Sequence, residues 1–139
     1  MLEHVTRNEF DFLHNKSVLG HGVDFVGIIN KHGRMVDYVC KNEINLSNEK
    51  KEMFFMEISL QMSMQKEYDM EFGPVRYVIA ERDNSKVISI PISTGAIVAI
   101  MRKSAYHFAF IKKILESIRH AKSQDNDSEL EGSLEHIRY

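Results

Sequence analysis

Apolar residues recur along this chain with two different periods, and the change from one period to the other marks the elements that the sequence predicts. Residues 23–30 (VDFVGIIN) form a run rich in β-branched and aromatic residues. Residues 34–41 (RMVDYVCK) return as a second strand with two alternating faces, Met35, Asp37 and Val39 on one and Val36, Tyr38 and Cys40 on the other. Gly33 stands between the two runs, where a tight turn needs a residue that adopts a positive φ easily. The pattern therefore predicts a β-hairpin over residues 23–41.

A helical period follows over residues 47–72. Ser47 is in place to cap the amino end of this helix, and Gly73-Pro74 is a common sequence after a helix end. At about 100° per residue, one helix face collects the side chains expected to cover the sheet, namely Met53, Met56, Leu60, Met64 and Tyr68. Phe55 and Met62 lie further round the helix. This surplus of apolar residues predicts a second buried contact, with another copy of the chain.

Three more strands and a closing helix are predicted after the long helix. The strands are expected over residues 75–82, 86–92 and 96–102. Pro91 has no N–H to give to a neighbouring strand, so the second of these strands must bulge or end early there. Residues 96–102 are apolar on both alternating faces, as expected for a central strand. Apolar positions at helical spacing predict helices over residues 105–121 and, near the start of the chain, over residues 7–19.

In this order the elements predict one α/β (α+β) domain. A five-stranded, mostly antiparallel sheet carries the long helix on one face and the amino- and carboxy-terminal helices on the other. A chain of 139 residues is close to the usual size of a single domain. After Lys122 the sequence becomes polar, acidic and poor in core residues, so we expect a folded domain over residues 1–122 and a disordered tail over residues 123–139.

The net charge of −2 is unevenly distributed along the chain. Residues 1–72 have a net charge of −4, residues 73–122 one of +6 and residues 123–139 one of −4. Solvated faces that differ by chance explain this pattern. The sharper interpretation is a basic docking surface on neighbouring strands, which the acidic tail covers. Its candidate residues are Arg76, Arg82, Lys86, Arg102 and Lys103.

Nothing in the sequence has the pattern of a reaction centre. There is no GxxxxGK[ST] phosphate loop, and the histidines lack the close spacing typical of metal sites. Cys40, the single cysteine, falls in an alternating strand and is expected to be a half-buried core residue. Asp24 and Asp37 lie on adjacent predicted strands, where two carboxylates can share acid–base work or lie apart. We therefore predict a protein that is not an enzyme, with no cofactor and no metal site.

The location of the protein is predicted from three further features. No apolar stretch is long enough to span a membrane, and the amino terminus lacks the pattern of a signal peptide. A single free thiol suits a reducing compartment. We therefore expect a cytoplasmic protein without membrane insertion.

This order of elements resembles the roadblock/dynein-light-chain fold, a relative of the longin and profilin-like sandwiches. The segments that carry the resemblance are residues 25–30 with Gly33-Arg34, residues 72–78, residues 81–83 and the hairpin over residues 90–100. They are also similar to those of a group of small archaeal proteins with that fold. The likeness covers roughly residues 7–120 and consists of structural turns and strands, so it is specific for the fold rather than for a function.

The resemblance implies a role in protein interactions. Roadblock proteins commonly dimerise by joining edge strands and packing their long helices, and they serve as platforms or regulators for small Ras-like GTPases and for motor or trafficking assemblies. We therefore expect a homodimeric docking module for a small GTPase or an assembly partner. The expected dimer contacts are Phe55, Met62, Met70, Tyr77 and Ile79. Two alternatives remain open, a nucleic-acid-associated regulatory protein that uses the basic residues and a small-molecule sensor.

Overall fold

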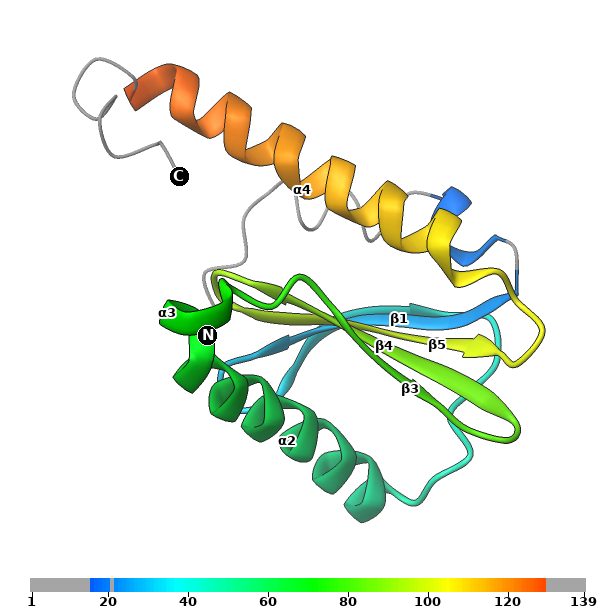
Figure 1. Cartoon of the computed structure of the whole chain (residues 1–139). Helices are drawn as coiled ribbons and strands as arrows, with labels where there is room; N and C mark the ends of the chain where they lie inside the picture. The colour runs from blue at the N-terminus through cyan, green and yellow to red at the C-terminus, as the bar shows by residue number, and fades with distance from the viewer. Residues whose placement is uncertain (1–15, 21, 130–139) are drawn as a thin grey trace.

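The computed structural model describes residues 16–20 and 22–129. A five-stranded antiparallel sheet lies between two helical layers, with α4 above it and α2 below it in Figure 1. The strands are β1 (Val23–Asn30), β2 (Met35–Cys40), β3 (Val78–Glu81), β4 (Ser85–Ile92) and β5 (Gly95–Arg102). The helices are α2 (Asn48–Gln65), α3 (Asp69–Phe72) and α4 (His107–Glu129), with short 3₁₀ helices η1 (Lys16–Leu19) and η2 (Lys66–Tyr68). The strand order β2-β1-β5-β4-β3 and the two covered faces confirm the predicted sandwich.

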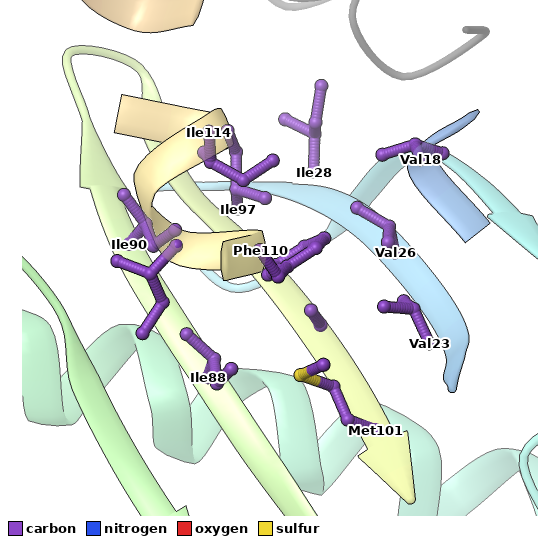
Figure 2. Close-up of a cluster of buried hydrophobic side chains, with 12 residues drawn as sticks. Val18, Val23, Val26, Ile28, Ile88, Ile90, Ile97, Met101, Phe110 and Ile114 are labelled. Carbon is purple, nitrogen blue, oxygen red and sulfur yellow. The ribbon is translucent and has the colours of Figure 1, made fainter. Parts of the chain in front are cut away.

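Each face of the sheet has its own hydrophobic core. The core under α4 joins Val18 of η1 to strand residues such as Ile28 and Ile97 and to Phe110 and Ile114 of α4, as Figure 2 shows. The core under α2 is a separate cluster of Phe25, Ile29, Phe55, Ile58, Met62, Val87, Ala96 and Val98. β1 and β5 contribute side chains to both clusters. Both faces of these strands are therefore covered, which explains why their sequences are apolar at almost every position.

The turn between β1 and β2 is fixed beneath the middle of α2. The buried Asn30 side chain organises the turn, since its Oδ1 accepts hydrogen bonds from the backbone N–H groups of His32 (2.9 Å) and Arg34 (3.0 Å). Ser59 of α2 then donates its hydroxyl to the carbonyl of Lys31 at 2.6 Å. The turn therefore sets the position of α2 over the sheet.

Several predicted elements differ from the structure in their bounds. The long helix predicted over residues 47–72 ends at Gln65 and continues as η2 and α3, while Ser47 caps it as predicted, accepting from the Lys50 N–H. The strand predicted over residues 75–82 is shorter, because pairing with β4 begins only at Val78 opposite Ser89. Pro91 therefore lies in β4 beyond the end of β3, where its missing N–H leaves no bond unmade.

The two ends of the chain are described only in part. Of the helix predicted over residues 7–19, residues 7–15 lie outside the described part, and residues 16–19 form η1. α4 continues to Glu129, beyond the expected start of a disordered tail at residue 123. The division at residue 122 therefore stays a prediction, while the helical backbone of residues 123–129 differs from the disorder expected there.

Candidate interaction surface

The outward side of α2 exposes a row of long apolar side chains. Met53, Met56, Leu60 and Met64, here called the α2 row, each leave between 55% and 63% of their surface exposed. Single exposed apolar residues are ordinary on protein surfaces, but a contiguous set on one helix face marks an interaction site. Methionine side chains suit such a site because they are flexible and polarisable.

The prediction of which α2 face covers the sheet was wrong. Phe55 (5% exposed), Ile58 and Met62 (8% exposed) pack on the sheet, and the face expected to be buried is the α2 row. The Phe25 ring stacks on Phe55, with ring centroids 5.9 Å apart, which favours this orientation. Phe55 and Met62 belong to the core of their own chain, so the dimer contact expected through them is corrected.

The segment after α2 adds three exposed apolar side chains. Tyr68 closes η2, and Met70 and Phe72 belong to the single turn of α3. Met70 is 94% exposed and Phe72 is 85% exposed. The expected contact residue Met70 is thus available to a partner, and the apolar surface extends past the carboxy end of α2.

A groove runs between β2 and the amino-terminal half of α2. Its volume is about 840 Å³, and its floor is mainly apolar, with Phe25, Met35, Tyr38, Cys40, Ile44, Phe55 and Met56 among the lining residues. Two of the lining residues pack closely over Gly27, because a Cβ there would lie 2.8 Å from the Met35 sulfur and 2.9 Å from the Phe25 ring. Arg34, Lys51, Glu43 and Glu52 line it as well. This size suits a small molecule or an apolar side chain of a partner.

The two edges of the sheet differ in how open they are. On β2, the carboxylate of Asp37 accepts a hydrogen bond from the Tyr38 N–H at 2.9 Å, which closes that N–H to another strand. A register shift in the β1–β2 pairing further disrupts this edge. At the other edge, Ile79 of β3 and Tyr77, which comes just before β3, are half-buried and pack toward the α4 core. β3 is the edge at which we expect pairing with another strand.

Replacing Asp37 with alanine is expected to allow the β2 edge to pair with a strand of another molecule. The Tyr38 N–H loses its acceptor and becomes available to a strand of another molecule, so larger species appear in light scattering at high protein concentration. The melting temperature should change by only a few degrees, since Asp37 is half-buried on an edge strand and outside both hydrophobic cores. Asp83→Ala, in the exposed β3–β4 turn, is the control. An Asp37→Ala protein whose mass matches that of the control contradicts this role.

The predicted basic docking surface is not assembled as expected. Lys86 is buried, and its Nζ donates to the Ala105 carbonyl at 2.8 Å and lies 3.1 Å from Nδ1 of His107. Arg76 lies before β3 and Arg82 after it, so an extended chain of about 20 Å separates them. Arg82, Arg102 and Lys103 remain exposed at one end of the sheet.

Replacing Lys86 with methionine should lower the free energy of unfolding by about 1–3 kcal/mol, because the Ala105 carbonyl and the His107 ring lose their partner. The start of α4 is the region affected, and urea unfolding followed by circular dichroism measures the loss. Lys103→Met removes an equal charge from an exposed position and should leave the midpoint nearly unchanged. Equal midpoints for the two variants count against a structural role for Lys86.

The residues considered for chemistry do not form a reaction centre. The Asp24 carboxylate accepts a hydrogen bond from the Asn42 side-chain amide at 3.3 Å and lies 3.8 Å from Nε of Arg102. Asp37 does not face Asp24, because it pairs with Ile28, which is four residues beyond Asp24 on β1. Cys40 is half-buried beside the α2 core, as predicted. Within residues 16–20 and 22–129 no three His, Cys, Asp or Glu side chains are grouped to hold a metal ion. No helix in the same part of the chain is long and apolar enough to cross a membrane.

Comparison with solved structures shows that the fold is roadblock-like. A Roadblock/LC7 domain from Streptomyces avermitilis is 12% identical, with a TM-score of 0.57 over 74% of this chain and 85% of that chain. The gliding protein MglB from Thermus thermophilus is 8% identical, with a TM-score of 0.63 over 84% of this chain and 92% of that one. An MglB with a tetrameric arrangement is 6% identical, with a TM-score of 0.60 over 86% and 96%. No protein-family model and no curated protein matches the chain.

Proposed function

We propose that this protein is a self-associating protein-interaction module rather than an enzyme. The observation that carries the proposal is the α2 row, four large apolar side chains exposed together on a helix whose opposite face packs on the sheet through Phe55, Ile58 and Met62. Met70 and Phe72 extend the same apolar character. Covering this exposed apolar area with a partner is favourable, because the area is removed from water.

Self-association has support from the sheet as well. β3 is an edge strand, and joining the β3 edges of two copies continues the sheet from one copy to the next. Tyr77 and Ile79, two of the expected dimer contacts, lie in this segment. The tetrameric MglB of the same fold is a precedent for assembly.

The experiment that tests self-association is light scattering of the full chain over a range of protein concentrations. We expect the average mass to rise with concentration toward a multiple of 16.2 kDa. A mass that stays at one chain at every concentration removes self-association from the proposal.

The partner that we propose is a small GTPase, which is the class implied by the roadblock-like fold. Capture of lysate proteins on the immobilised full chain, with GDP or with a non-hydrolysable GTP analogue, tests this choice. A small GTPase retained with only one of the two nucleotides supports it, most clearly if Leu60→Glu abolishes the retention. Captured proteins that disappear after nuclease treatment favour a nucleic-acid-associated role instead.

A small-molecule sensor is a second candidate, which the groove between β2 and α2 favours. Its volume of about 840 Å³ and its aromatic floor suit an organic ligand. Three of its lining residues are stacked aromatic rings, since the centroid of the Phe25 ring lies 5.7 Å from that of Tyr38 and 5.9 Å from that of Phe55. A thermal-shift screen of metabolites tests this role, and a genuine ligand of the groove should lose its effect in Tyr38→Ala.

A further inference from the structure

We propose that the groove between β2 and α2 binds an elongated organic acid, with its carboxylate at the β1–β2 turn and its alkyl chain along β2. The inference rests on the second proposed function, the small-molecule sensor, and names the class of ligand. Among the described residues that line the groove, only Met56 belongs to the α2 row. The inference is therefore separate from the proposed self-association.

The groove follows the whole length of β2. Its lining begins with Arg34 before the strand, continues with Met35, Tyr38 and Cys40 of the strand, and reaches Ile44 in the loop after it. Six strand residues span roughly 20 Å. A groove of this length suits an extended alkyl chain better than a compact molecule.

The apolar floor also favours an alkyl chain over a flat ring. The Phe25 ring is 5% exposed and is stacked on both Tyr38 and Phe55, and Phe55 is 5% exposed as well. A flat ligand therefore finds little open ring face on Phe25 or Phe55. The side chains of Met35 and Met56 are flexible and can adapt to a chain that lies beside them.

The charged residues of the groove differ between its two ends. Arg34 and His32 belong to the turn before β2, whereas Glu43 belongs to the loop after β2. Lys51 and Glu52, consecutive residues of α2, have opposite charges that offset each other. A carboxylate is therefore attracted to the turn end and repelled from the loop end, which sets the direction of the bound acid.

Two further charges beside the groove do not change this direction. Glu57 lines a neighbouring hollow together with Lys31 and His32, so the charge of Lys31 offsets that of Glu57 near the turn. At the loop end, Glu43 lies in the same groove as Asn48, the first residue of α2, where the helix dipole is positive. An ammonium is therefore less favoured at Glu43 than a carboxylate is at Arg34.

Cys40 provides a direct measure of occupancy. It is the single cysteine of the chain, it is half-buried, and it lines the groove that the alkyl chain would fill. The probe is dodecanoate, added to the full chain below its micelle concentration. The rate at which iodoacetamide alkylates Cys40, followed by mass spectrometry, reports binding. Iodoacetamide is neutral, so its own approach does not depend on the charge of Arg34.

We expect saturating dodecanoate to slow this alkylation at least fivefold while the circular dichroism spectrum stays unchanged. Dodecanol and dodecylamine, which have the same chain without the carboxylate, should protect much less at the same concentration. Decanoate should need an approximately three- to tenfold higher concentration for half-protection, because two methylene groups fewer are removed from water.

Arg34→Gln tests the position of the carboxylate. It should raise the dodecanoate concentration for half-protection about two- to fivefold, as expected for the loss of an exposed ion pair. Lys50→Gln is the matched control, because it removes the same charge from an exposed residue of α2 outside the groove lining. This control should leave the half-protection concentration unchanged.

Four results would overturn the inference. They are unchanged alkylation in dodecanoate, faster alkylation, which indicates unfolding by a detergent effect, equal protection by dodecanol or dodecylamine, and equal half-protection in Arg34→Gln and Lys50→Gln. If the metabolite screen still finds a compound whose thermal shift is lost in Tyr38→Ala, the sensor role stands with another class of ligand. If neither experiment finds a ligand, the inference and the sensor role fall together.

Discussion

Replacing Gly33 with alanine is expected to lower the free energy of unfolding by about 2–4 kcal/mol. Gly33 has a φ of +82°, which side chains with a Cβ rarely adopt, and it lies directly beneath α2. A Cβ there would lie 2.6 Å from Cα of Met56 and 2.8 Å from the carbonyl oxygen of Phe55. Because both atoms belong to the helix backbone, the clash is relieved only if α2 or the turn moves. Urea unfolding of the full chain measures the loss.

Gly73→Ala is a matched control for this experiment. Gly73 also has a positive φ, of +84°, but no atom lies within 4 Å of a Cβ built there. Its replacement should therefore cost only the backbone strain of a residue with a Cβ at φ +84° and ψ 164°, about 1–3 kcal/mol, without a clash against α2. The difference between the two variants measures how closely the β1–β2 turn supports α2. Equal losses would falsify the idea that this turn positions the helix.

Replacing Met62 with glutamate is expected to unfold most of the protein, whereas replacing Met64 with glutamate should leave it folded. Met62 is 8% exposed in the core under α2, so an ionised carboxylate there is buried without a partner and costs about 4 kcal/mol or more. Met64 is 63% exposed, so the same carboxylate remains in water. The two residues are neighbours on one helix with the same chemistry, which makes each a control for the other.

The measurements for this pair separate stability from interaction. Circular dichroism should show a large loss of structure for Met62→Glu and a normal spectrum for Met64→Glu. Light scattering should show that Met64→Glu is more monomeric than the natural chain. A folded Met62→Glu protein with impaired association supports instead the original expectation that Met62 is a contact residue.

The candidate surface was only partly predictable from the sequence. The expected contact residue Met70 is exposed, and Tyr77 and Ile79 lie in or beside the edge strand, because helix ends and strand order follow from local patterns. The α2 row was assigned to the wrong side. A sequence signal was present, since apolar residues occupy much more of the helix circumference than one sheet contact needs, but that signal does not say which side is covered.

The positions of the basic residues were likewise only partly predictable from the sequence. Lys86, Arg102 and Arg82 come from neighbouring strands or their ends, as expected from the strand order. Whether a lysine on a strand reaches solvent depends on what packs above it. The loop before α4 covers Lys86 and supplies the carbonyl that its ammonium binds, and this loop is distant in the sequence.

The sequence by itself determined the order and kind of the elements, the hairpin turn at Gly33 and the central place of β5, because these depend on local periodicity and on residues with special backbone freedom. Only the tertiary structure decided which face of α2 is buried and where α2 ends. The buried face follows from contacts between distant residues, namely Ser59 with Lys31, Phe55 with Phe25, and the α2 backbone with Gly33. A helix with apolar residues on most of its surface is turned by such contacts, and its own sequence does not specify them.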